Sequence, residues 1–308
     1  MIRHSANPAS DESYVLAEGP VWDGARNRVL WVDINGHHVL TGELLTDELQ
    51  GDRIVETERL SFPGTVGAVV CSAAGELLFA GPRQLLTVGP DGSVATAPGP
   101  DLIPPDKNSR LNDGGCDPSG RFLVGSLNLD DRPDPDNTDA PDDEQLLRID
   151  PSGRVTVIDD DLGLSNGLAW SPDGSWFYSI DTKPGLIWIR SYDSDSGRYG
   201  ERRVFLKISN GSPDGMCLDA EGNLWVAIWG AGEVRCFSPT GEPLAIVEVA
   251  APHTTSVAFV GPNLDTLLIT TATEQLSTAQ LDQYPDSGKL FTASVGKTGL
   301  PVPYWSGF

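Results

Sequence analysis

The chain has 308 residues, of which 39% are hydrophobic, with 34 Gly and 24 Pro. No stretch reaches the roughly 20 apolar residues that a membrane-spanning helix needs, and a net charge of −23 disfavours binding to nucleic acid or to anionic lipid. The first residues, MIRHSANPASDESYV, lack the apolar centre of a signal peptide. We therefore expect a soluble, cytoplasmic protein with many short strands and tight turns, and with no nucleic-acid or membrane partner.

One hairpin pattern recurs along the chain: a residue followed by Gly, three or four apolar residues, a polar turn that usually ends in Gly, and a second apolar run. In chain order the copies are AEGPVWDGARNRVLWVD from Ala17, VGAVVCSAAGELLFAG from Val66, NDGGCDPSGRFLVGS from Asn112, SNGLAWSPDGSWFYSID from Ser165, PDGMCLDAEGNLWVAIW from Pro213 and TSVAFVGPNLDTLLITT from Thr255. Their anchor residues, Gly or Ser, are 41 to 53 residues apart, which leaves room for two further strands per copy, as in 146–158 and 187–205.

Four strands in a repeat of about 40 to 50 residues are typical of a propeller blade. The six copies predict an all-β, six-bladed β-propeller with four-stranded antiparallel blades around a central tunnel, in a single domain over residues 1–308. The first and last segments are expected to share one blade, which closes the ring without an exposed edge. A doubly wound fold is disfavoured because helical periodicity is almost absent, and the Gly-Ala-Gly at 230–232 lies in a hairpin turn rather than at the start of a helix.

The cysteines and histidines show no metal-binding spacing. Cys71, Cys116, Cys217 and Cys236 form no C-x-x-C pair and lie in or beside apolar runs, so we expect reduced, buried side chains. The four His residues form no H-x-x-x-H pattern, which disfavours a His-rich zinc site.

In a propeller, equivalent positions of the blades lie on a ring where the innermost strands meet the axis. The residues before the six anchors define this ring as Glu18, Val66, Asp113, Asn166, Asp214 and Thr255. Five of the six carry a side-chain oxygen, and converging carboxylates repel one another. A hard divalent cation such as Ca²⁺, Mg²⁺ or Mn²⁺ would remove that repulsion. Asn-Gly and Asp-Gly are also ordinary turn pairs, whereas Glu-Gly is not.

Four stretches carry a resemblance to a known family: LAEGPVWD from Leu16, RLNDGGCDPSGRFLVGS from Arg110, LSNGLAWSPDG from Leu164 and SPDGMCLDAEGNLWVAIWG from Ser212. With them, nearly the whole chain resembles the SMP-30/gluconolactonase/luciferin-regenerating family. The resemblance implies one divalent ion on the axis, Ca²⁺, Zn²⁺, Mn²⁺ or Mg²⁺. It also implies Glu18, Asn166 and Asp214 as its ligands, with Asp214 in addition as the general base.

The same resemblance implies contacts to a sugar substrate from Arg110 and Asn112. A third polar contact would align near Asp130, with Asn128 as the alternative, because SLNLDDRPDPDNTDAPDDEQ departs from the animal pattern of the family. That segment carries eight acidic residues from Asp130 to Glu144. It is either a solvated surface loop or a lid over the site.

We therefore expect a metal-dependent lactonase that opens an aldonolactone such as a gluconolactone, xylonolactone or arabinolactone. The cation would polarise the lactone carbonyl, Asp214 would accept a proton from the attacking water, and Arg110 would donate to a sugar hydroxyl or a lactone oxygen. The chain has no G-x-S-x-G, so a serine hydrolase is unsupported. Two alternatives stay open: an organophosphate or other ester hydrolase on the same scaffold, and a non-catalytic calcium-binding propeller. The expected partner is a small-molecule sugar lactone, bound by a monomer or a dimer.

Overall fold

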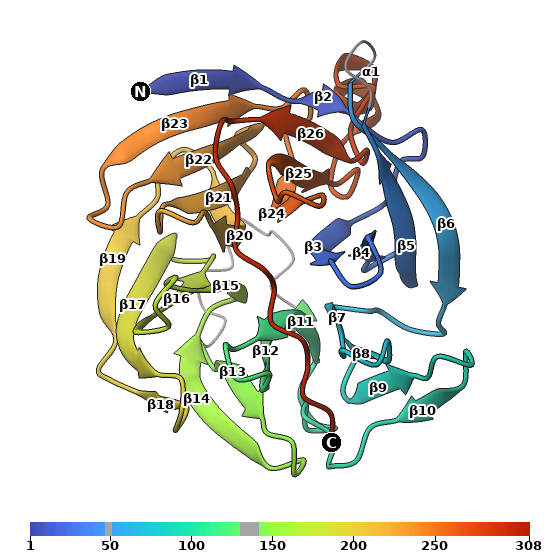
Figure 1. Ribbon diagram of the computed structural model, residues 1–308, viewed down its shortest axis with the longest axis vertical. Helices are drawn as coiled ribbons and strands as arrows, with labels where there is room; N and C mark the ends of the chain where they lie inside the picture. Colours follow the sequence, from blue (N-terminus) through green and yellow to red (C-terminus); the bar gives the residue numbers. More distant parts are fainter. Residues whose placement is uncertain (47–50, 130–141) are drawn as a thin grey trace.

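The computed structural model describes residues 1–46, 51–129 and 142–308. The strands form six sheets around a central axis, and the first strand of each repeat lies nearest that axis (Figure 1). The fold is therefore a six-bladed β-propeller, as the repeat predicts. No helix in these residues is long and apolar enough to cross a membrane.

The first three blades each contain four antiparallel strands. Blade 1 consists of β3 (Ala17–Asp23), β4 (Arg28–Asp33), β5 (His38–Leu45) and β6 (Arg53–Ser61). Blade 2 consists of β7 (Val69–Cys71), β8 (Leu77–Ala80), β9 (Leu85–Val88) and β10 (Val94–Thr96). Blade 3 consists of β11 (Ser109–Cys116), β12 (Phe122–Asn128), β13 (Glu144–Ile149) and β14 (Val155–Leu162).

The last three blades carry additional elements. Blade 4 consists of β15 (Ser165–Trp170), β16 (Trp176–Asp181), β17 (Leu186–Asp193) and β19 (Arg203–Lys207), with the short β18 (Arg198–Tyr199) beside β17. Blade 5 consists of β20 (Ser212–Leu218), β21 (Leu224–Trp229), β22 (Glu233–Phe237), β23 (Pro243–Glu248) and β1 (Ile2–Ser5). Blade 6 consists of β24 (Thr254–Val260), β25 (Thr266–Thr271), β26 (Phe291–Ser294) and β2 (Asn7–Pro8), and α1 (Thr278–Gln283) lies between β25 and β26.

The N-terminal segment closes the ring. Strand β2 pairs antiparallel with β26, so the first and last parts of the chain share blade 6, as the sequence predicts. Strand β1 extends further and pairs in parallel with β23 of blade 5, an addition that the repeat did not indicate. The N-terminal eight residues thus join the outer strands of two neighbouring blades.

Five of the six inner strands change register close to the axis, between Glu18 and Val21, Leu111 and Gly114, Asn166 and Leu168, Pro213 and Met216, and Thr254 and Ser256. Such a bulge breaks the ladder and re-aims the side chains beside it. Glycine is required where neighbouring strands meet: a Cβ on Gly167 would lie 2.7 Å from the backbone oxygen of Asp214. The anchor glycines therefore allow the inner strands to converge.

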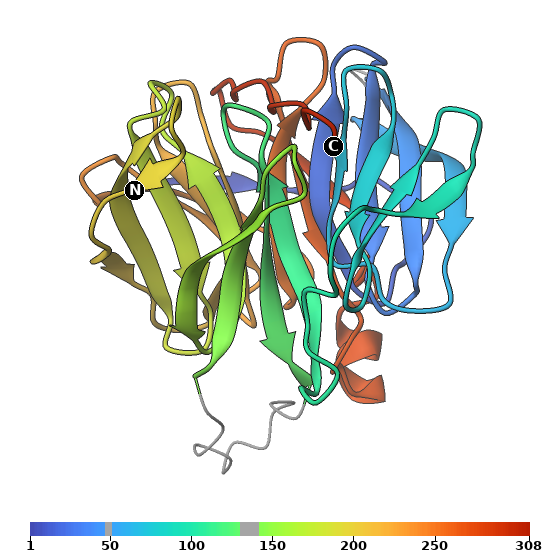
Figure 2. The ribbon, with the colours of Figure 1, turned by 90° about the horizontal axis from the view of Figure 1, so that it is seen from below.

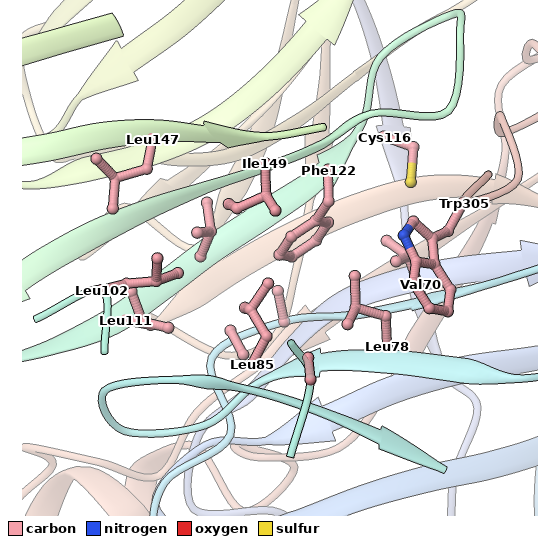
Figure 3. Close-up of a cluster of buried hydrophobic side chains, with 14 of the residues drawn as sticks. Val70, Leu78, Leu85, Leu102, Leu111, Cys116, Phe122, Leu147, Ile149 and Trp305 are labelled. Atoms are coloured by element: carbon pink, nitrogen blue, oxygen red, sulfur yellow. The ribbon is translucent and has the colours of Figure 1, made fainter. Parts of the chain in front are cut away.

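Most of the core lies between neighbouring blades. Figure 3 shows one such cluster, in which Leu78 and Leu85 of blade 2 meet Leu111 and Phe122 of blade 3. Because both faces of a blade are covered by its neighbours, the second strands read as nearly continuous apolar runs rather than as alternating patterns. The four cysteines are free, as expected, and three of them are buried, whereas Cys217 is only partly buried.

The C-terminal segment crosses one end of the axis (Figure 1). Trp305 forms a β-bridge with Ser72 and packs into the cluster between blades 2 and 3, and the backbone N–H of Ser306 donates to Gly120 O at 3.0 Å. Helix α1 lies at the opposite end of the molecule (Figure 2). The two ends of the axis are therefore built differently.

Candidate active site

The end of the axis away from the C-terminal segment contains a cavity of about 360 Å³. Its buried polar lining comes from the first residues of four inner strands, namely Glu18, Arg110, Asn112, Asn166 and Asp214. Its remaining polar lining comes mainly from the ends of the second strands and the loops that follow them, including Asn35, Asn128, Lys183 and Glu274. A separate cavity of about 420 Å³, lined in part by residues 300–303, lies at the other end.

The three side chains predicted as metal ligands come together from blades 1, 4 and 5. Glu18, Asn166 and Asp214 are each 6% exposed, and Asn166 Nδ2 donates to Asp214 Oδ1 at 2.5 Å. Thr182 supports this arrangement, because its Oγ1 accepts from Asn166 Nδ2 at 3.1 Å and donates to Pro213 O at 2.8 Å. The short strand β15 thus holds its amide against the neighbouring blade.

The predicted sugar-contacting pair lies beside these residues. Arg110 Nη1 donates to Asn112 Oδ1 at 2.6 Å, and Asn112 Nδ2 donates to Ser165 O at 3.0 Å. Asn112 Nδ2 also lies 3.3 Å from Asn166 Oδ1. The guanidinium of Arg110 is therefore oriented through Asn112, which is itself fixed to blade 4.

The acidic side chains near the axis disfavour one another's charge. Burial raises the pKa of Glu18 well above its ordinary value, and the charges of Asp214 and Asp113 raise it further. Burial also raises the pKa of Asp214, and the charge of Asp113 adds to this, while Asn166 and Arg110 act in the opposite direction. For Asp113, burial raises the pKa to about 6. A bound cation would offset this mutual repulsion.

The structure divides the six ring positions between different environments. Asp113 lines the cavity at the opposite end of the axis, and its Oδ1 accepts from the backbone N–H of Gly114 at 2.8 Å. Val66 is fully buried in an apolar cluster. Thr255 Oγ1 donates to Ala17 O at 2.6 Å, so it joins blade 6 to blade 1. Only Glu18, Asn166 and Asp214 of the six line the cavity.

The third predicted substrate contact, Asp130, lies outside the described residues. Its alternative, Asn128, does line the cavity. From the acidic segment, Asp142 approaches the rim, where Lys183 Nζ lies 3.4 Å from its Oδ1.

The sequence did not single out Asn35, Thr182, Lys183, Trp229 or Glu274 as lining residues. The repeat could have indicated these positions. Trp229 ends the second strand of its blade, and the other four residues follow the second strand of theirs. Equivalent loops of a propeller meet at one end of the axis.

The donor set fits a hard divalent cation. Among residues 1–46, 51–129 and 142–308, no three His, Cys, Asp or Glu side chains form a group that could hold a metal ion. The amide oxygen of Asn166 would supply a third protein ligand beside the two carboxyl groups, and a half-turn of that amide exchanges its oxygen and nitrogen. Two carboxyl groups and one amide suit Ca²⁺, Mg²⁺ or Mn²⁺.

The sequence profile of the SMP-30/Gluconolactonase/LRE-like region matches residues 16–273. The chain belongs to this family. Regucalcin from Danio rerio is 34% identical to it over 95% of both chains. The 6-deoxy-6-sulfogluconolactonase of Pseudomonas putida is 33% identical, over 95% of this chain and 96% of the relative. Among solved structures, the calcium-binding protein regucalcin from Agrobacterium tumefaciens superposes with a TM-score of 0.86 at 25% identity, covering 99% of this chain and 98% of that one.

Membership of the SMP-30/Gluconolactonase/LRE-like family agrees with the propeller and with the extent of the repeat. The matched region begins at Leu16, two residues before Glu18, and ends at Thr273, directly before Glu274. It therefore includes all six inner strands and most of the cavity lining.

Proposed function

We propose that this protein is a metal-dependent lactonase that hydrolyses a sugar aldonolactone of the gluconolactone, xylonolactone or arabinolactone type. The observation that carries this proposal is the convergence of Glu18, Asn166 and Asp214 with Arg110 and Asn112 in one buried, polar cavity. The names of two relatives, a sulfogluconolactonase and a calcium-binding regucalcin, support the reaction class and the use of a divalent ion.

Glu18, Asn166 and Asp214 would hold the cation. When bound, a divalent ion polarises a carbonyl oxygen and lowers the pKa of a coordinated water. Three protein ligands are fewer than such ions take, which leaves positions for water and substrate. The chemistry and the binding of substrate would then take place at the same end of the axis.

Asp214 is the proposed general base. Its carboxylate would accept a proton from the attacking water as the water oxygen bonds to the carbonyl carbon. The ring C–O bond then breaks, and the proton passes to the leaving ring oxygen, so the product is the hydroxy acid. Arg110 would donate to a hydroxyl or to the lactone oxygen, and Asn112 fixes the orientation of its guanidinium.

A panel of five- and six-membered aldonolactones tests the activity, assayed with the metal-free protein and with added Ca²⁺, Mn²⁺, Mg²⁺ or Zn²⁺. We expect at least one metal to accelerate ring opening of at least one lactone well above the spontaneous rate. Failure of every combination would remove the lactonase proposal. If one equivalent of cation still bound in that case, the protein would be either a non-catalytic calcium-binding propeller or a hydrolase of other esters. Assays with aryl esters and organophosphates would distinguish these two alternatives.

A further inference from the structure

The cavity has a second polar wall that the proposed chemistry does not use. Trp229 ends β21 of blade 5, Asn35 follows β4 of blade 1, and Glu274 follows β25 of blade 6. Blade 6 lies across the axis from blade 3, which supplies Arg110 and Asn112 (Figure 1). The two groups of residues therefore face the cavity from opposite sides.

Trp229 is held by a stacked partner. The rings of Trp229 and His253 lie parallel within 13°, with centroids 4.0 Å apart, and a β-bridge joins their backbones. His253 Nδ1 lies 2.8 Å from Glu274 O, and burial lowers the pKa of His253, so the imidazole is neutral near pH 7. The stack covers one face of the indole. The part of Trp229 that meets the cavity is thus the other face or the ring edge.

Glu274 is held equally firmly at the rim. Asn35 Nδ2 donates to Glu274 Oε2 at 2.8 Å, and the backbone N–H of Glu274 donates to Val15 O at 3.0 Å. The next residue, Gln275, has φ +62°, a left-handed conformation that is uncommon for residues other than glycine. Glu274 lines the cavity, and the contact with Asn35 fixes the orientation of its carboxylate.

We propose that Trp229, Glu274 and Asn35 form the subsite for the hydroxylated part of the lactone ring remote from the carbonyl. An aromatic face carries negative charge density and attracts the weakly positive C–H face of a sugar ring. A fixed carboxylate accepts hydrogen bonds from the ring hydroxyls, and an amide NH₂ group donates hydrogen bonds to them. This subsite presupposes the lactonase activity proposed above. It favours neutral polyhydroxy lactones over lactones with an anionic substituent at the remote end, because the carboxylate of Glu274 would repel such a substituent.

Substitution of Trp229 tests the aromatic contact. We expect Trp229→Leu to raise KM for the preferred lactone about 10-fold, with a smaller change in kcat, and Trp229→Phe to retain most of the affinity because the aromatic face remains. A cyclic polyol without the carbonyl should inhibit the wild type competitively and inhibit Trp229→Leu about 10-fold more weakly. Trp176→Leu, on an exposed strand end, is the matched control for loss of a tryptophan. Thermal unfolding of all variants shows whether each remains folded.

Glu274→Gln tests the charge discrimination. We expect the wild type to prefer a neutral lactone over its anionic counterpart with a remote sulfonate or phosphate, and Glu274→Gln to reduce that preference about 10-fold at low salt. The subsite would be overturned if folded Trp229→Leu kept the KM and the polyol inhibition of the wild type and folded Glu274→Gln kept its charge preference. Such a result would leave the lactonase proposal intact. Binding of the polyol by calorimetry in the wild type, but not in Trp229→Leu, would support the subsite even if no lactone were hydrolysed, so the two proposals fail separately.

Discussion

Asn166 is a single amide that connects three blades. Its side chain contacts Asn112 of blade 3, Thr182 of its own blade and Asp214 of blade 5. Because it is neutral, it adds a donor oxygen to the site without adding a further negative charge to Glu18 and Asp214. A carboxylate at this position would increase the repulsion that already raises the pKa of both neighbours.

The first prediction concerns the general base. We expect Asp214→Asn, which keeps the shape of the side chain, to lower kcat/KM for the preferred lactone at least about 100-fold, because it removes both the proposed proton acceptor and one of the proposed cation ligands. Asp113→Asn is the matched control, since it also removes one acidic group near the axis but faces the other cavity. Steady-state kinetics across a metal titration, with circular dichroism to confirm folding, measures both. Equal losses in the two variants would show that the charge near the axis, rather than the position of Asp214, determines activity.

At the scale of the element, two strand ends position the site. Asp33 ends β4 and Asp181 ends β16, the second strands of blades 1 and 4. The carboxylate of Asp33 accepts backbone N–H groups of Val15 and Leu16, and that of Asp181 accepts those of Gly163 and Leu164. Each carboxylate therefore fixes the segment that leads into the inner strand carrying Glu18 or Asn166.

The raised pKa of Asp181 predicts that the stability of the fold depends on pH. Burial raises its pKa from 3.8 to about 6, so the folded protein binds this proton more tightly than the unfolded chain. The contribution of protonated Asp181 to stability is complete below about pH 4 and is lost as the pH rises through about 6. We expect the free energy of unfolding to fall more between pH 4.5 and 7 in the wild type than in Asp181→Asn, as urea denaturation at both pH values would measure. Parallel pH profiles would contradict this assignment.

The sequence predicted the blades and their hairpins correctly because those signals are local. Turn residues such as Pro172 and Gly174 and the apolar runs around them specify a hairpin wherever it lies in the molecule. The placement of side chains at the axis depends instead on bulges, which have no comparable signature. In β11 the unpaired residues are Asn112 and Asp113, and they line cavities at opposite ends of the axis.

The sequence predicted the candidate site only in part. The structure places five of the predicted site residues in one cavity, namely Glu18, Asn166, Asp214, Arg110 and Asn112, whereas their chemical roles stay predictions. The second wall was missed because the stack of Trp229 on His253 and the bond from Asn35 to Glu274 join residues of different repeats. The stack depends on the packing of consecutive blades and the bond on closure of the ring, and no single repeat encodes either.

At the scale of the whole molecule, the ring closes where the N-terminal residues meet blade 6. Asn7 pairs with Thr292 and Pro8 with Phe291. The backbone N–H of Ala9 then donates to Leu290 O at 2.7 Å, while Ala9 O accepts from Ile54 N at 2.7 Å. The closing segment is thus bound to blade 6 and to blade 1. Its removal would expose the edge of β26 and remove this link between the two blades.

Truncation tests this closure. Deletion of residues 1–5 removes only β1, which lies outside β23, so we expect a folded protein with a small loss of stability. Deletion of residues 1–9 also removes β2 and the contacts of Ala9, and it should cost about 1 kcal/mol for each lost backbone hydrogen bond, together with greater aggregation. Thermal unfolding and light scattering compare the two deletions. A Tm of the longer deletion equal to that of the shorter one would show that other contacts close the ring.

Cation binding should stabilise the whole propeller, because its proposed ligands come from blades 1, 4 and 5. A ligand that binds only the folded state stabilises it by about 2.7 kcal/mol at 100 times its Kd. We expect the free energy of unfolding to rise with Ca²⁺ or Mn²⁺ concentration in the wild type and in Asp113→Asn, but not in Glu18→Gln or Asp214→Asn. Urea denaturation across a metal titration measures this difference. An equal rise in all four proteins would place the stabilising cation elsewhere on the acidic chain, because only a cation on the axis depends on Glu18 and Asp214 together.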